Sequence, residues 1–165
     1  MNLASEIANP RVWFNGGTFS AHPLALLAGK EMLEHLVTHE DEIYPALAER
    51  GDRMRAGVER VFADRGVLAR CTGHGNDAID GGSLATIYFP LHEDLDPSSA
   101  EDLQDPALCD TVMREQVLKL GLLLHDVNIV HGLGALSYSH TDEDLAHLFD
   151  ACDAFARRLT GKDEV

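Results

Sequence analysis

A glycine-rich turn lies directly before an apolar helical segment near the start of the chain, at residues 15–25. Gly16 and Gly17 free the backbone there, and Thr18 supplies a hydroxyl group and an amide N–H. Pro23 suits the first turn of a helix, where its missing N–H would have no helical partner in any case. A turn that feeds a helix start in this way can bind an anion such as a phosphate, although most such turns are only helix caps.

Apolar residues recur at helical spacing in four stretches, and each stretch predicts a helix. Thr38 and Thr141 are the expected N-caps of the second and fourth helices, and the residues from Thr141 onward have a capping-box pattern. Gly66 and Gly121 are expected to end the second and third helices. The expected ranges are about 23–36, from Thr38 to about Gly66, 107–120 and from Thr141 to Gly161.

Short runs rich in β-branched and aromatic residues predict strands between these helices. The clearest covers residues 83–89 and is stopped by Pro90. Further strands are expected at residues 11–14, 67–71 and 134–139, a short buried segment at 122–124, and loops at 72–82, 92–106 and 126–134. Three or four short strands with helices packed on one face indicate an α+β fold.

The chain is acidic, and its charge limits the partners that it can bind. Its 165 residues include 28 acidic and 13 basic side chains, which gives a formal net charge of −15. This charge argues against nucleic acids and anionic membranes as partners. The three cysteines show no CxxC spacing, no run approaches the ~20 apolar residues of a membrane span, and the N-terminus lacks a signal-peptide pattern. We therefore expect a cytoplasmic protein.

The stretch from Gly17 to Ala25 resembles the Gly-Thr-(aromatic or Leu)-Ser-Gly-(Asn or His)-Pro-Leu-Ala segment of class III pyridoxal-phosphate (PLP) aminotransferases. The nearest branch is that of glutamate-1-semialdehyde 2,1-aminomutase. Residues 82–89, 121–124 and 137–144 resemble later landmarks of the same family, in the same order. The resemblance thus runs from about Trp13 onward, and the order of its landmarks makes it more specific than any single motif.

This resemblance implies the small C-terminal domain of a fold-type-I PLP enzyme, with a short antiparallel sheet and helices on one face. It assigns residues 17–165 to that domain and residues 1–16 to a loop or a remnant of the large-domain end. Gly17 and Thr18 would bind the cofactor phosphate, the latter across a dimer interface in the neighbouring subunit's site. Ala21 departs from the family, which usually has Gly there, and this suggests a slightly altered turn.

The residues that perform the family's chemistry have no counterpart in this chain. In such enzymes a lysine holds PLP as a Schiff base, and it precedes the Gly-Thr motif. Lys30, Lys119 and Lys162 all follow Thr18, so no catalytic residue is assigned. The sequence resembles the last third of such an enzyme and fits a truncated reading frame, a piece of a split enzyme or a domain that has lost activity.

Two further regions bear on function. The nine histidines show no metal-binding spacing, so no metal site is assigned, and His140 is expected to have a structural role before the last helix. The loop at residues 124–134 departs most from the aminomutases, whose substrate-contacting glutamate in this loop has no clear counterpart. That departure speaks against glutamate semialdehyde as the substrate.

Two functional hypotheses follow. In the first, the chain is the C-terminal portion of a PLP-dependent aminotransferase or aminomutase, inactive alone, which acts on a small-molecule amino donor and acceptor as a homodimer or with a large-domain partner chain. In the second, it is a non-catalytic dimerisation or regulatory module on the same scaffold. Only the first predicts that replacing Thr18 weakens PLP binding.

Overall fold

The computed structural model describes Gly17, residues 22–75 and residues 81–161. The chain divides into two compact units, Met1–Asp41 and Glu42–Val165, and the division falls inside a long helix. The strand expected at residues 11–14 lies outside the described residues. Within the described ranges, no helix is both long enough and apolar enough to cross a membrane.

The first unit contains helix α1 (Pro23–Thr38), which confirms the first predicted helix and extends it by two residues. His22 is the N-cap, and its Nδ1 accepts a hydrogen bond from the Ala25 N–H at 3.4 Å. Thr38 was expected to be the N-cap of the second helix, but this prediction is wrong. Thr38 is the last residue of α1. Its hydroxyl donates to the Glu34 carbonyl at 2.7 Å, and this bond holds it within α1.

Helix α2 (Glu40–Asp64) confirms the second predicted helix, and Ile43, Met54, Val58 and Phe62 form its buried face. Gly66 follows its end with a φ of 75°, as expected of a C-terminal cap. Gly51, inside the helix, lies against the loop before the second strand. A Cβ atom there would be 2.1 Å from the Gly82 carbonyl oxygen, so only glycine permits this approach.

Among the described residues of the second unit, three strands form an antiparallel sheet in the order β1-β2-β3, and the α+β prediction is confirmed. They are β1 (Arg70–Cys71), β2 (Leu84–Tyr88) and β3 (Leu133–Ala135). The outer strands are shorter than predicted because turns occupy the rest of each expected range. The Val67 N–H bonds to the Phe62 carbonyl, and the Ser137 N–H bonds to the ring of His140.

The predicted bounds of the third helix, residues 107–120, are wrong at both ends. A π-helical segment, η3 (Met113–Leu118), runs directly into α3 (Lys119–Leu123), so the helix passes through Gly121. Glycine is required there because a Cβ atom would lie 2.1 Å from the Phe155 ring. The expected buried segment at 122–124 is also wrong, since only Leu122 is buried. A short 3₁₀ helix, η2 (Asp102–Gln104), lies in the expected loop at 92–106.

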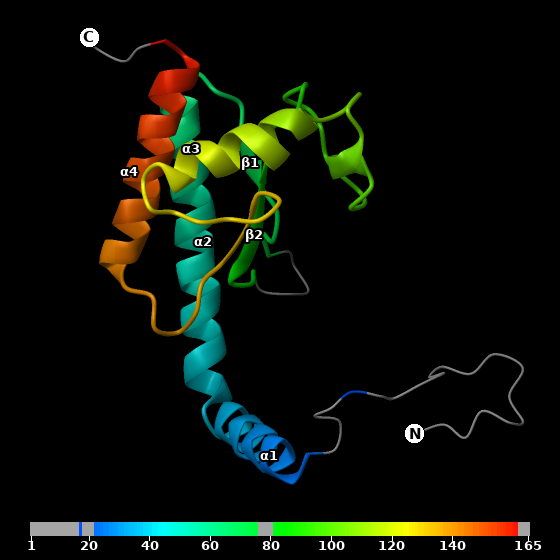
Figure 1. The fold of residues 1–165 in the computed structure, drawn as a ribbon, viewed down its shortest axis with the longest axis vertical. Helices are drawn as coiled ribbons and strands as arrows, with labels where there is room; N and C mark the ends of the chain where they lie inside the picture. Colours follow the sequence, from blue (N-terminus) through cyan, green and yellow to red (C-terminus); the bar gives the residue numbers. More distant parts are fainter. Residues whose placement is uncertain (1–16, 18–21, 76–80, 162–165) are drawn as a thin grey trace, which may run out of the picture. The chain divides into compact units, whose positions relative to one another are not determined.

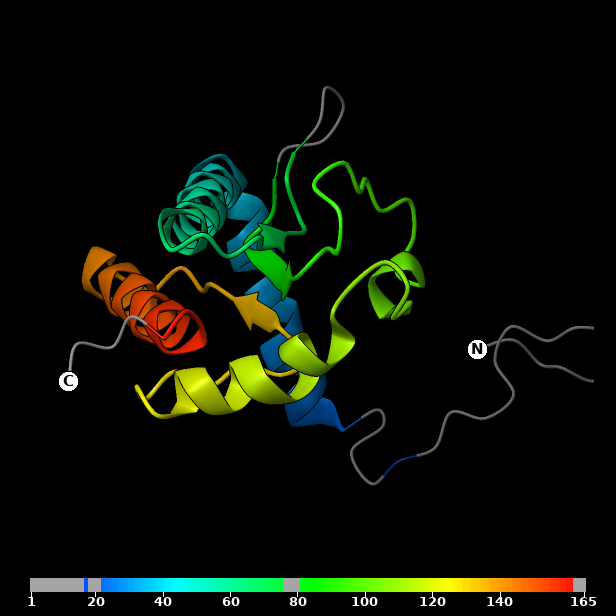
Figure 2. The ribbon, with the colours of Figure 1, turned by 90° about the horizontal axis from the view of Figure 1, so that it is seen from above.

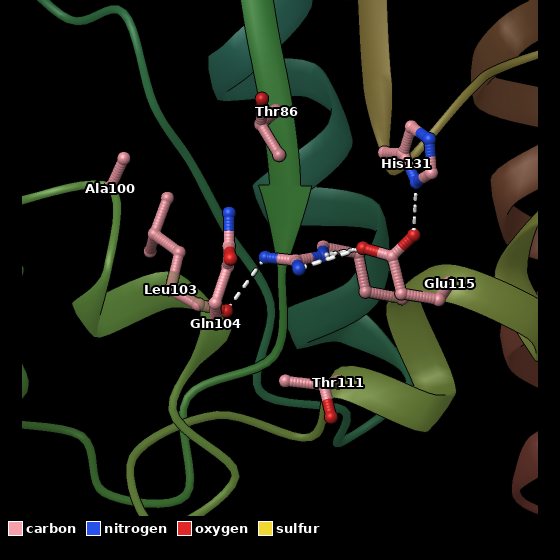
Figure 3. Close-up of a pocket in the computed structure, with 8 residues that line it drawn as sticks. Thr86, Ala100, Leu103, Gln104, Thr111, Glu115 and His131 are labelled. Atoms are coloured by element: carbon pink, nitrogen blue, oxygen red, sulfur yellow. Dashed lines mark hydrogen bonds and ion pairs between the residues drawn. The ribbon is translucent and has the colours of Figure 1, made fainter.

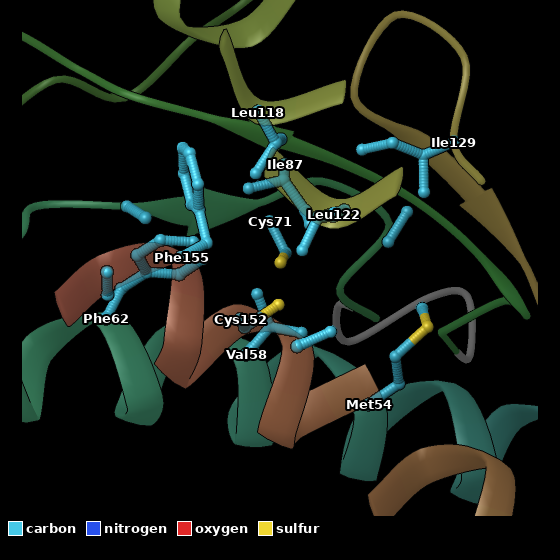
Figure 4. Packing of buried hydrophobic residues seen from close by; sticks show 14 of the residues in the cluster. Met54, Val58, Phe62, Cys71, Ile87, Leu118, Leu122, Ile129, Cys152 and Phe155 are labelled. Carbon is cyan, nitrogen blue, oxygen red and sulfur yellow. The ribbon is translucent and has the colours of Figure 1, made fainter. Parts of the chain in front are cut away.

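The last helix, α4 (Asp142–Leu159), begins with the predicted capping box between Thr141 and Asp144. Figures 1 and 2 show α2 and α4 on one side of the sheet, and the core fills the space between these layers. Figure 4 shows Cys71 and Cys152 inside this core, where burial raises the pKa of each thiol to about 12. Both cysteines are free.

Candidate functional site

The two predicted phosphate-binding residues lie at the edge of what the structure describes. Gly17 is exposed, and Thr18 lies outside the described residues, so its role stays a prediction. Helix α1 begins downstream with Pro23 in its first turn, as the motif requires. The described sequence around this helix start is therefore compatible with the predicted turn.

A cavity of about 610 Å³ opens on the face of β2 that lies away from α2 and α4. Successive residues of a strand point to opposite faces, so Thr86 faces this cavity while Ala85 and Ile87 are buried in the core. Figure 3 shows the side chains that surround it, which come from β2, from η2 and the loop before it, from η3 and the residues before it, and from the turn before β3. The lining residues are Thr86, Ala100, Leu103, Gln104, Thr111, Arg114, Glu115 and His131.

Arg114 is the buried cation of this cavity, with only 7% of its surface exposed. Its Nε and Nη2 both lie 2.7 Å from Oε1 of Glu115, and its Nη1 donates to the Leu103 carbonyl at 2.7 Å. A Cβ atom on Gly132 would lie 2.8 Å from Cγ of Arg114, so the side-chain stem packs closely against that turn. Arg114 thus connects η3 with η2 and with the turn before β3.

Glu115 extends this network to the cavity rim through a short contact between its Oε2 and Nδ1 of His131. Burial alone would raise the pKa of the Glu115 carboxyl, but hydrogen bonds from His131 and Arg114 outweigh it and lower that pKa. His131 has a φ of 55°, and Gly132 follows with a φ of 72°. This left-handed turn directs the His131 ring toward Glu115 (Figure 3).

A second, smaller cavity of about 260 Å³ lies beside the loop expected to contact substrate in the family. Asp126 and Asn128 of that loop line it, together with His140 and His147 at the start of α4. The Nδ1 atom of His140 accepts a hydrogen bond from the Ser137 N–H at 2.9 Å, so the expected structural role of His140 is confirmed. In the described residues, no cluster of His, Cys, Asp and Glu side chains is suited to a metal ion.

The lysines provide a direct test of fit to PLP. Lys30 is exposed on α1 and pairs with Glu34 at 2.8 Å, and Lys119 is exposed on α3. Neither lines either of the two cavities, and Lys162 lies outside the described residues. The described residues therefore do not fit the Schiff-base part of a PLP site.

Comparisons with known proteins agree on one group of enzymes. Glutamate-1-semialdehyde 2,1-aminomutase of Halobacterium salinarum is 27% identical over 84% of this chain and 34% of its own length. β-Phenylalanine transaminase of Variovorax paradoxus is 33% identical over 86% of this chain and 29% of its own length. The crystal structure of an ω-transaminase from Sphaerobacter thermophilus matches 87% of this chain and 30% of its own, at 26% identity and a TM-score of 0.62. No family model matches the chain.

The chain is thus a homologue of glutamate-1-semialdehyde 2,1-aminomutases and of transaminases. It spans about a third of the length of these relatives, in keeping with a C-terminal portion. The resemblance inferred from the motifs at residues 17–25, 82–89, 121–124 and 137–144 is thereby confirmed.

Sequence reasoning missed the network of Arg114, Glu115 and His131. Neighbouring residues on an α-helix do not face each other, so the pair Arg114-Glu115 gave no signal of an ion pair. The π-helical geometry of η3, on which both residues lie, has no recognisable pattern in the sequence. His131 was only one of nine histidines that show no metal-binding spacing.

Proposed function

We propose that the chain is the C-terminal portion of a PLP-dependent aminotransferase or aminomutase, and that Gly17 and Thr18 form part of its phosphate site. The strongest support is the similarity in sequence and fold to known transaminases, over about a third of their length. PLP, when bound, supplies the electron sink for amino-group transfer between a small-molecule donor and acceptor. In this chain, the backbone N–H and hydroxyl of Thr18 would hold the phosphate.

The chain would contribute to the cofactor site without completing it. Its described lysines are exposed, so the Schiff-base lysine must come from a large domain. We therefore propose that the isolated chain is inactive and that it works in the cytoplasm with a polypeptide that supplies the other two-thirds of the relatives' length. A homodimer would then allow Thr18 to reach the neighbouring subunit's cofactor.

The surface of α1 supports the proposal of a partner. Leu26, Leu33 and Val37 lie on one side of this helix and are 61%, 65% and 67% exposed. Leu24 lies on the opposite side and is 68% exposed. A helix that is apolar on opposing sides is normally covered on both, and a large domain together with a second subunit would provide two such covers.

The first experiment is PLP trapping on the purified chain, with borohydride reduction and mapping of pyridoxyl-lysine by mass spectrometry. We expect no stoichiometric adduct, because both described lysines are exposed and neither lies in a pocket that could enclose a Schiff base. A stoichiometric adduct on Lys30 or Lys119 would contradict the proposed division of the site between two polypeptide parts.

The second experiment joins the chain to the complementary N-terminal part of the Variovorax paradoxus transaminase and measures PLP retention. Thr18→Val should weaken retention roughly tenfold or more because it removes a hydrogen bond to a charged phosphate, whereas Thr18→Ser should preserve it. Thr38→Val, at the far end of α1, is the matched control and should have no effect. Equal retention by Thr18→Val and Thr38→Val would count against the phosphate role.

The alternative is a free-standing dimerisation or regulatory module, which the exposed apolar positions of α1 also favour. It predicts a stable homo-oligomer of the 165-residue chain, with no PLP affinity and no response to Thr18→Val in either setting. Sedimentation equilibrium of the chain, together with PLP retention by the joined protein, distinguishes the two functions.

A further inference from the structure

We propose that the cavity between β2, η2 and η3 binds a small organic carboxylate, held by the guanidinium of Arg114 and by His131 at its rim. The inference uses residues of the second unit alone and goes beyond the proposed function. The cavity volume of about 610 Å³ lies in the range of small-molecule sites. Its lining combines a buried cation with several polar side chains, which is the composition that orients a charged ligand.

The hydrogen bonds of Arg114 leave it able to bind a ligand. A guanidinium has five N–H groups, and the contacts with Glu115 and the Leu103 carbonyl account for three of them. Two N–H groups therefore have no acceptor among the described residues, although the side chain is more than nine-tenths buried. Each guanidinium nitrogen already has one partner, and the two remaining N–H groups can donate hydrogen bonds to an incoming oxygen atom in the cavity.

The charges at the site favour a single carboxylate. Glu115 neutralises Arg114, and both of its oxygen atoms are already engaged, Oε1 by Arg114 and Oε2 by His131. It is therefore poorly placed to accept hydrogen bonds from a ligand. The planar guanidinium matches a carboxylate, which brings one negative charge to the neighbourhood of Glu115, whereas a phosphate dianion would bring two.

The neighbouring polar groups complete a donor-rich lining. Thr86, Gln104 and Thr111 line the cavity from three different segments, and each side chain carries a hydrogen-bond donor (Figure 3). The His131 side chain is 77% exposed at the rim, so it can contact a ligand while it keeps its contact with Glu115. The donors thus surround the space from several sides.

The acidic segment around η2 opposes anion binding, and the experiment has to allow for it. Asp102, Asp105 and Asp110 accept hydrogen bonds from Ser98 and Ser99, from Ala107 and from Met113, and none of the three lines the cavity. Their repulsion therefore acts at longer range, where salt screens it with a Debye length of about 8 Å at physiological ionic strength. Binding should be measured at that ionic strength.

The backbone around the site shows the departures from regular geometry that often accompany binding sites. The π-helical η3 presents Arg114 and Glu115 together, and π segments occur frequently at functional sites. His131 adopts a left-handed φ, which costs free energy for a residue other than glycine. Both departures serve the same ion-pair network.

The test is an NMR titration of the isotope-labelled 165-residue chain with butyrate, and with butyramide as the neutral probe of similar shape. We expect butyrate to cause saturable shifts at Arg114 Nε–H, Thr111 and His131, and butyramide to bind at least tenfold more weakly because it lacks the charge. Equal binding of the two probes, saturable shifts confined to another surface, or no saturation would overturn the proposal.

Three variants locate the site. Arg114→Gln should weaken butyrate binding at least tenfold, and His131→Asn, which tolerates the left-handed backbone, should weaken it severalfold. Arg158→Gln removes one charge from the exposed face of α4 and should leave binding unchanged. If Arg114→Gln fails to fold, His131→Asn and Thr111→Val carry the test. Equal weakening by Arg158→Gln would show a general charge effect and reject the site.

Discussion

At the scale of single residues, glycines set how closely the helices approach their neighbours. Gly121 lies inside the continuous η3–α3 helix, where a Cβ atom would be 2.1 Å from Phe155 Cδ2. We expect Gly121→Ala to lower the free energy of unfolding by about 1–3 kcal/mol through overpacking, measured by urea denaturation. The control is Gly29→Ala in α1, where no atom lies within 4 Å of the added carbon. Comparable losses in both variants would contradict the packing argument.

Asp153 links α4 to the end of α2, because its two carboxylate oxygens accept bonds from Arg65 at 2.6 and 3.0 Å. The bond from Arg65 lowers the pKa of Asp153 below its ordinary 3.8, burial opposes this, and Arg157 adds to the lowering. The folded state therefore gains stability above the ordinary pKa and loses it as the pH falls through the lowered value.

Asp153→Asn should consequently cost about 1 kcal/mol at neutral pH and little in strong acid. Urea unfolding of both proteins across this pH range measures the difference. The control is Asp150→Asn on the same helix, because Asp150 forms no ion pair with a described residue. A difference for Asp153→Asn that persisted undiminished in strong acid would exclude the ionised pair as its cause.

At the scale of elements, the start of α4 depends on one threonine. The Thr141 hydroxyl accepts a bond from the Asp144 N–H at 3.3 Å, and the Asp144 carboxylate accepts one from the Thr141 N–H at 2.7 Å. Thr141→Ala should destabilise the second unit by about 1 kcal/mol, whereas Thr141→Ser should retain most of the stability. Thermal unfolding followed by circular dichroism tests this, and equal melting of all three proteins would show that the cap is dispensable.

The sequence predicted these elements unevenly. Helices α1, α2 and α4 have sustained periodicity and recognisable ends such as Gly66 and Thr141, so they were placed to within a few residues. The third helix was misplaced because Gly121 looks like a C-terminal cap, while its actual role is to admit Phe155 from α4. Local pattern carries no information about a contact with a distant ring.

The two candidate sites also differ in how far the sequence alone could predict them. Thr18 is visible in the sequence because it belongs to a contiguous motif, and its role awaits experiment. The cavity around Arg114 draws on β2, η2, η3 and the turn at His131. No contiguous pattern joins these segments, so only the folded chain reveals that they meet.

At the scale of the whole molecule, the two units have contrasting surfaces. The second unit buries a continuous core, whereas α1 buries none of its residues. Leu24→Glu and Leu33→Glu change opposite sides of α1. We expect each to weaken association with the proposed large domain, measured by co-purification with the complementary part of a relative. Glu31→Gln serves as the control, and full association of both leucine variants would argue that α1 is not the contact.

The buried cysteines make it possible to measure how often the core opens, through the rate at which their thiols are labelled. A thiol with a pKa of about 12 is almost entirely protonated at neutral pH, and only the thiolate attacks alkylating reagents. Cys71 and Cys152 should therefore remain unlabelled until the core opens, after which each becomes an ordinary reactive thiol. The rate of labelling at these two thiols therefore reports the rate of core opening in the unaltered chain. A bound partner or ligand that stabilises the closed core would slow the labelling.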